Sequence, residues 1–185
     1  MKPHRNDRID PVNTIELRSE QLTLITATPD LLRADLAADG TLGKALQAET
    51  PADWPSGEYE ADAIRSFLEQ TEAAGDAGTG WYCWYAISEE DGQRKLVGCG
   101  GFRGAPNAEG TVEAGYSIAE AEQGKGYATE MLGILVGFAF TNGANKIVAR
   151  TRQSNPASIA VLNNNDFEQI GVINTEGMLE FALTA

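Results

Sequence analysis

The feature that most constrains the fold is a glycine-containing loop that leads directly into a strongly amphipathic segment, residues 123–142. The apolar residues of this segment recur at i, i+3, i+4, i+7, i+8, i+11 and i+12, the spacing of one helix face. Asn142-Gly143 then supplies a left-handed stop. We therefore predict a helix over residues 124–142 with one apolar face. That face consists of Ala128, Met131, Leu132, Leu135, Val136, Ala139 and Phe140.

Strands and further helices are expected on both sides of this helix. Thr28 and Asn155 each precede a proline, the pattern of an N-cap followed by proline at the first helical position. With 185 residues, the chain has room for one domain. We expect an α/β fold around one sheet over residues 15–185, after a polar tail at residues 1–14. The expected strands cover residues 15–28, 81–88, 95–102, 111–118, 146–152, 167–172 and 178–183, and the other helices cover 29–40, 42–49, 60–74 and a segment after Asn155.

The two cysteines lie in strands that a turn at Asp91-Gly92 joins into a hairpin. A two-residue turn would pair Cys83 with Gly100 and Trp84 with Cys99, placing the sulfurs on opposite sheet faces, where they cannot bond. A slip of one residue would bring both sulfurs to one face. Unpaired cysteines, together with the polar first residues and an apolar run far shorter than the ~20 residues of a membrane span, favour a cytoplasmic protein.

Composition excludes several classes of function. The net charge of −13 repels phosphate backbones, so nucleic acid is not an expected partner. No membrane partner is expected either, because the longest apolar run is too short to span one. The single histidine, His4, lies in the polar tail, which argues against a histidine-dependent hydrolase. One histidine and two cysteines also leave too few ligands for a zinc site, and no metal is expected.

The loop before the long helix has the properties of an anion site. Gly124 and Gly126 allow a sharp turn, and the first amides of the helix have no partner within it and lie at the positive end of its dipole. Lys125 adds a positive charge. The alternative interpretation is a tight turn between a strand and a helix. It is not a P-loop, because the required spacing is absent, and a dinucleotide fingerprint fails because Thr129 stands at its third glycine.

These residues resemble a known family. Gln123-x-x-Gly126-x-Ala128 matches the Q/R-x-x-G-x-G/A signature of the GCN5-related N-acetyltransferases (GNAT). The stretches Glu113-Ala-Gly-Tyr116 and Asn155-Pro-Ala-Ser158-Ile-Ala-Val-Leu162 look like the ribosomal-protein N-terminal acetyltransferase branch, RimJ/RimL type. The resemblance implies a mostly antiparallel sheet, flanked by helices and splayed where acetyl-CoA binds.

The resemblance also implies which residues hold acetyl-CoA. Its pyrophosphate would lie on the loop at residues 123–128, and its pantetheine arm would lie along residues 111–118, where that strand splays from residues 146–152. Asn155 would hydrogen-bond the arm, although it is also a helix N-cap. A backbone N–H near residues 116–118 would bind the developing oxyanion. The residues expected to contact acetyl-CoA are Tyr116, Ser117, Ile118, Gln123, Gly124, Lys125, Gly126, Tyr127, Ala128, Thr129, Asn155 and Ser158.

The implied reaction is direct attack of an amine on the thioester. A free alkyl amine has a pKa of ~10.4, so a general base helps at neutral pH. Glu113 is the candidate base, or else a carboxylate that orients the acceptor or faces solvent. Ser158 is the candidate proton donor to the leaving thiolate, or else it stabilises the first turn of its helix. Many relatives carry a tyrosine at the position of Leu162, and a glycine at that of Asp166, which tolerates a left-handed conformation.

The acceptor side is less defined. Trp54, Tyr59 and Trp84 are candidate substrate contacts, although such aromatics also occur in cores. An acidic run over residues 49–62 favours a cationic acceptor, unless it is simply a solvated face. We therefore expect a monomeric or homodimeric acetyltransferase acting on a small-molecule or peptide amine. The alternatives are another acyl-CoA donor, and a CoA-binding sensor or idle relative without transferase activity.

Overall fold

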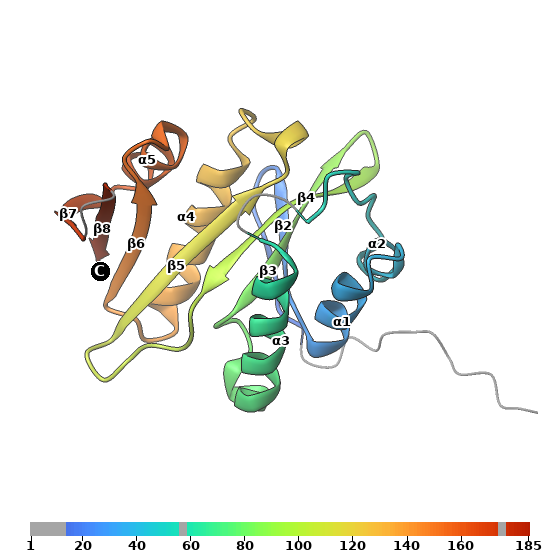
Figure 1. The fold of residues 1–185 in the computed structure, drawn as a ribbon, viewed down its shortest axis with the longest axis horizontal. Helices are drawn as coiled ribbons and strands as arrows, with labels where there is room; N and C mark the ends of the chain where they lie inside the picture. The colour runs from blue at the N-terminus through green and yellow to red at the C-terminus, as the bar shows by residue number, and fades with distance from the viewer. Residues whose placement is uncertain (1–13, 56–58, 174–176) are drawn as a thin grey trace, which may run out of the picture.

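The fold is an eight-stranded sheet with helices on both faces (Figure 1). The structure is a computed structural model that describes residues 14–55, 59–173 and 177–185. The strand order is β1-β2-β3-β4-β5-β6-β8-β7. The strands are β1 (Glu16–Arg18), β2 (Leu22–Thr26), β3 (Cys83–Glu90), β4 (Gln93–Phe102), β5 (Thr111–Ile118), β6 (Lys146–Arg152), β7 (Glu168–Val172) and β8 (Met178–Thr184). The helices are α1 (Pro29–Ala37), α2 (Thr41–Leu46), α3 (Ala61–Ala74), α4 (Tyr127–Thr141) and α5 (Pro156–Asn164), with short 3₁₀ turns η1 (Gly75–Gly78) and η2 (Glu120–Glu122).

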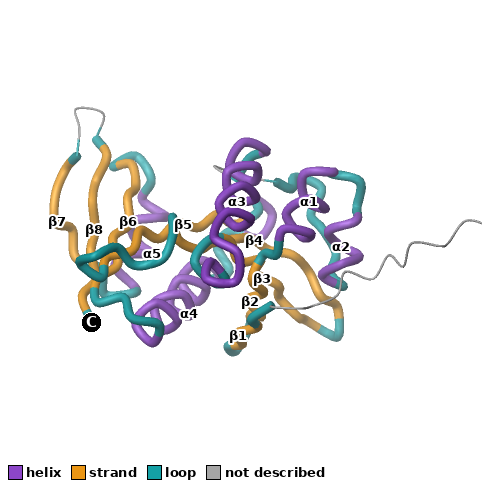
Figure 2. The backbone as a smooth tube through the Cα atoms, turned by 90° about the horizontal axis from the view of Figure 1, so that it is seen from below, coloured by secondary structure: helices purple, strands orange, loops and turns teal. Residues whose placement is uncertain are grey.

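The sheet separates the helices into two layers, and each layer packs on its own apolar core (Figures 1 and 2). Helices α1, α2 and α3 cover the β2–β4 half of one face, where Tyr85 and Ile87 are buried. Helices α4 and α5 cover the other face, where Trp84 and Val112 are buried. Alternate residues of β2, β3 and β4 therefore belong to different cores. Among the described helices, none is long and apolar enough to cross a membrane.

Strands β5 and β6 separate partway along their length. They are the parallel pair of the sheet, and their ladder runs from Thr111–Lys146 to Ala114–Ala149. Beyond that rung β5 continues beside β4, with Gly98 opposite Ile118, while β6 continues beside β8, with Arg152 opposite Met178. Figure 1 shows the two strands diverging toward the end where α4 begins. The expected splay thus lies after Ala114 and Ala149.

Most predicted elements are confirmed, and the differences have local causes. Strands β5 and β6 have the expected bounds, and the Asn155 side chain caps α5 by accepting from the Ser158 amide at 3.0 Å. Asp166 adopts a left-handed φ of 61°. The single extended segment expected at residues 15–28 is instead two paired strands, because the polar residues 19–21 form a turn between them. The predicted polar tail falls almost wholly on residues 1–13, outside the described residues.

The predicted pairing of the two cysteine-bearing strands is wrong by one residue. Cys83 lies opposite Gly101 and Tyr85 lies opposite Cys99, because a register shift occurs between Ala86 and Ile87. Both sulfurs therefore lie on the α1–α3 face, where the two cysteines are buried free thiols. The bulge, which spacing does not reveal, decided the register.

Candidate functional site

The loop before α4 is an open, uncapped helix start. Gly126 is its N-cap, with a left-handed φ of 88° and no side-chain cap, and Gly124 has a φ of 78°. A Cβ built on either glycine would meet no atom within 4 Å. The first amides of α4 have no intrahelical partner and lie at the positive end of the helix dipole. The loop therefore has the free donors and the open space that a bound anion requires.

The side chains of this loop are tied to the body of the protein. Gln123 Nε2 donates to the Ile118 carbonyl at 3.1 Å, which fixes the loop to the end of β5. Lys125 Nζ lies 2.8 Å from the carboxylate of Glu122, whose side chain is only 3% exposed and also pairs with Lys95. The charge of Lys125 is thus already partly compensated. The positive charge expected from Lys125 is therefore present beside the loop, but it is paired with Glu122.

Two hydroxyl groups meet at the opening between β5 and β6. Tyr116 lies on β5 beyond the last rung with β6, and its side chain packs on the α4 side. Its hydroxyl lies 3.0 Å from Ser158 Oγ and donates to the Ser158 carbonyl at 3.2 Å. Burial raises the pKa of the Tyr116 phenol, an effect that the hydrogen bond with Ser158 partly opposes. The phenol is therefore protonated at neutral pH and can donate.

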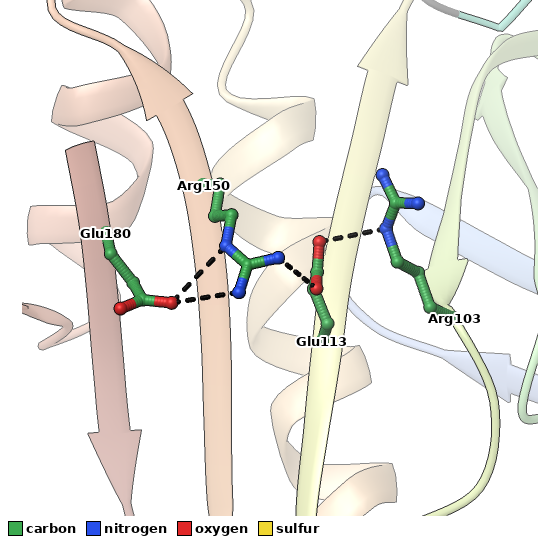
Figure 3. Close-up of polar contacts among 4 residues, drawn as sticks. All are labelled: Arg103, Glu113, Arg150 and Glu180. Carbon is green, nitrogen blue, oxygen red and sulfur yellow. Dashed lines mark hydrogen bonds and ion pairs between the residues drawn. The ribbon is translucent and has the colours of Figure 1, made fainter. Parts of the chain in front are cut away.

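Glu113 lies on the other face of β5, in a network of four charged residues (Figure 3). Its two carboxylate oxygens pair with Arg103 Nε at 2.8 Å and with an Arg150 terminal nitrogen at 2.7 Å. Arg150 also pairs with Glu180 of β8 at 3.0 Å. The Glu113 side chain is 19% exposed, whereas that of Arg103 is 80% exposed. An incoming cation could thus displace Arg103 from Glu113 with little loss of buried contact.

The three aromatic residues predicted to contact the acceptor lie in different environments. Trp84 is fully buried in the α4-side core and donates to the Gly80 carbonyl at 2.9 Å. Tyr59 is buried under α1, and its hydroxyl donates to Asp35 at 2.8 Å. Both are core residues here, so the expectation that they contact an acceptor is corrected. Trp54 is half-buried, and its indole N–H donates to Asp35 at 2.8 Å.

Asp35 is a residue that the sequence reasoning overlooked. Its buried carboxylate accepts hydrogen bonds from Trp54, Tyr59 and Tyr85, at 2.8, 2.8 and 2.9 Å. Burial raises the pKa of Asp35, and these three hydrogen bonds oppose the shift. Leu31, Leu32 and Asp35 share the buried face of α1, and this spacing could have identified the residue.

Asp53 connects the loop of Trp54 to the other end of the site. Its carboxylate accepts from the Glu120 amide at 2.9 Å, in the short turn η2 that follows β5. The loop at residues 51–55 therefore reaches from α1 to the segment that precedes the glycine loop. Within the described part of the chain, no group of three or more histidine, cysteine or acidic residues could hold a metal ion.

Comparison with known proteins gives one family. The sequence profile of the acetyltransferase (GNAT) domain matches residues 23–168. The uncharacterized N-acetyltransferase YjdG of Bacillus subtilis strain 168 is 28% identical over 152 residues, which are 82% of this chain and 88% of that protein.

Solved structures show the same fold at low identity. The ribosomal-protein-S5-alanine acetyltransferase of Vibrio fischeri superposes with a TM-score of 0.64 at 14% identity, over 92% of this chain and 96% of that one. The microcin C7 self-immunity acetyltransferase MccE, solved with acetyl-CoA and AMP, gives a TM-score of 0.62 at 16% identity, over 90% and 94% of the two chains. At these identities the likeness concerns the fold.

Proposed function

The chain belongs to the acetyltransferase (GNAT) domain family and is an acetyl-CoA-dependent N-acetyltransferase. We propose that it acetylates a primary amine in the opening between β5 and β6. The acceptor would be a peptide N-terminus or a small amine. The observation that carries this proposal is the end of the β5–β6 ladder at Ala114–Ala149, next to an uncapped helix start with open space above it. A thioester arm needs a gap between strands, and its pyrophosphate needs free amides.

We assign acetyl-CoA binding to two groups of residues. The amides of Tyr127, Ala128 and Thr129, with the turn at Gly124 and Gly126, would hold the pyrophosphate. Along the opening, the backbone of Ser117 and Ile118 and the side-chain amide of Asn155 would hold the pantetheine arm. The Asn155 side-chain oxygen already caps α5, which leaves its NH₂ group as the donor.

Glu113 is proposed as the carboxylate that receives the acceptor amine. An ammonium that displaces Arg103 would meet a carboxylate still held by Arg150, and it could then pass one proton to Glu113 or to water. The nitrogen forms its bond to the acetyl carbon while the carbon–sulfur bond breaks and the sulfur keeps the electron pair. A carboxylate that only orients the ammonium fits the same contacts, and kinetics separate the two roles.

Ser158 is proposed to serve the leaving sulfur. Its hydroxyl lies at the first turn of α5, beside the phenol of Tyr116. It can donate its hydrogen to the thiolate. The nitrogen loses its second proton as the amide forms, and this proton can return to Ser158 through water, so an ammonium and acetyl-CoA give the amide, CoA and one released proton.

The proposal is tested by calorimetry followed by an acceptor screen. We expect tight binding of acetyl-CoA and CoA but not of NADH, and acetylation of at least one member of a panel of peptides, polyamines and aminoglycosides. Failure of acetyl-CoA to bind would contradict the assignment of this site. Binding without acetylation of any amine would favour the alternative, a CoA-binding sensor.

A further inference from the structure

Tyr116 and Ser158 come from two elements that separate at the opening, and they touch through their side chains. Tyr116 is on β5, two residues beyond Ala114, where the ladder with β6 ends. Ser158 is in the first turn of α5, which follows β6. The phenol therefore bridges the opening on its α4 side and links β5 to the element that continues from β6.

From this contact we propose that Tyr116 is a positioning residue that orients the Ser158 hydroxyl toward the sulfur of bound CoA. The inference rests on the proposed function, because it assumes that the sulfur lies at this opening. It adds a role for the Tyr116 side chain that is separate from backbone contacts of β5 with the pantetheine arm.

The geometry gives the phenol two alternative acceptors. When its hydrogen points at the Ser158 carbonyl, 3.2 Å away, the phenol oxygen can accept the hydrogen of Ser158 Oγ, 3.0 Å away. When it points at Ser158 Oγ, 3.0 Å away, the hydrogen of Ser158 is free to be donated elsewhere. A sulfur that gains negative charge favours the second arrangement, because a hydroxyl that accepts one hydrogen bond donates a stronger one.

Two further observations support this role. The pKa of the phenol is raised by burial, so it keeps its hydrogen through the neutral range. Leu162, one turn further along α5, is 1% exposed in the apolar core and carries no polar group. The Ser158 hydroxyl therefore has a polar side-chain neighbour on β5, Tyr116, and none at Leu162.

The test measures the pKa of the thiol of bound CoA, which requires no acceptor. CoA labelled with ¹³C at the carbon that bears the thiol is titrated by NMR, in the free state and bound to each variant. A free thiol of this type has a pKa of ~8.5. One directed hydrogen bond to the thiolate corresponds to a lowering of about one unit.

We expect the unaltered protein to lower the pKa of the bound thiol. Ser158→Ala should abolish the part of this lowering that the Ser158 hydroxyl causes, and Tyr116→Phe should remove about half of that part. The double variant should match Ser158→Ala, because Tyr116 acts only through Ser158. Tyr82→Phe, a half-exposed tyrosine outside the site, is the matched control and should behave as the unaltered protein. The dipole of α5 acts equally in all variants.

The outcomes distinguish this inference from the proposed function. If CoA binds and Tyr116→Phe leaves the thiol pKa unchanged, the positioning role is wrong while the proposed function stands. If Tyr116→Phe and Ser158→Ala have additive effects, Tyr116 acts independently of Ser158 and the inference is also overturned. If the unaltered chain does not bind CoA, the proposed function fails first, and this inference fails with it.

Discussion

The Glu113 carboxylate and the Arg150 guanidinium lie 2.7 Å apart across the parallel strands β5 and β6, at the last rungs before the strands diverge (Figure 3). Glu113 is opposite Val148, and Arg150 follows Ala149, the final residue of the ladder. The pair therefore holds the two strands together on one face at the point where backbone hydrogen bonds end. It also places a carboxylate at the base of the opening proposed for the thioester.

Replacing Glu113 by Gln is expected to lower acetyl transfer by about 10²-fold, the usual contribution of a general base. CoA affinity should be unchanged, because Glu113 lies on the face away from Tyr116 and Ser158. A fall in kcat at constant acceptor KM indicates a base, whereas a raised KM at constant kcat indicates an orienting carboxylate. Glu180→Gln, which alters the same network without touching Glu113, is the control. Full activity in Glu113→Gln would exclude both roles.

Replacing Gly126 by Glu is expected to weaken acetyl-CoA binding by at least about 10²-fold. The new side chain would enter the open space above the loop with a charge that repels phosphate. It would also strain the backbone, because φ is 88°. Gly143→Glu separates the two effects. Gly143 has a φ of 97° and equally open surroundings, but it lies after the other end of α4. Calorimetry should show normal binding for Gly143→Glu, and equal losses in both variants would contradict the assigned loop.

Replacing Asp35 by Ala is expected to destabilise the protein by about 3 kcal/mol, because three donors, of which Tyr59 and Tyr85 are buried, lose their acceptor at once. Urea unfolding at neutral pH measures this difference. Asp30→Ala, at an exposed position on the same helix, provides the control. A loss as small as that of the control would mean that the three donors find other partners.

Asp35 also predicts how stability depends on pH. The pKa of Asp35 in the folded protein is raised above the usual 3.8. The contribution of its protonated form to folding stability is therefore fully present below pH 3.8. The contribution decreases as pH rises toward the folded pKa and is constant above it. Relative to Asp35→Asn, the unaltered protein should therefore lose stability over this interval. Unfolding curves collected from pH 3.5 to 7 test this slope, and a slope of opposite sign would contradict it.

Glu122 predicts the opposite pH dependence. Burial would raise the pKa of its carboxyl, but hydrogen bonds from Lys125 and Lys95 outweigh burial and place it below the usual 4.5. The stability that Glu122 contributes is present above 4.5 and is lost as pH falls through the folded pKa. Glu122→Gln should remove this acid sensitivity, as measured by thermal unfolding between pH 3 and 6. An unchanged acid profile would show that the two lysines do not stabilise the folded state through Glu122.

The order of elements and the glycine loop could be predicted from the sequence because their signals are local. The apolar spacing of α4, the cap at Asn155 and the glycines before Tyr127 act within a few residues. Each appears in the expected segment, although α4 begins at Tyr127 and not at residue 124, because Gly124 and Gly126 are left-handed. The family signature lies in the same segments. These features depend on backbone geometry and helix periodicity, which neighbouring residues largely determine.

Contacts between distant segments were decided only by the tertiary structure. The bulge between Ala86 and Ile87 moved both cysteines to one face, and the sheet brought Arg103 and Arg150 to Glu113. Packing placed Trp84 in the core and joined Tyr116 to Ser158, 42 positions apart in the chain. Local patterns specify which elements form, whereas register and long-range side-chain partners follow from the way those elements pack together.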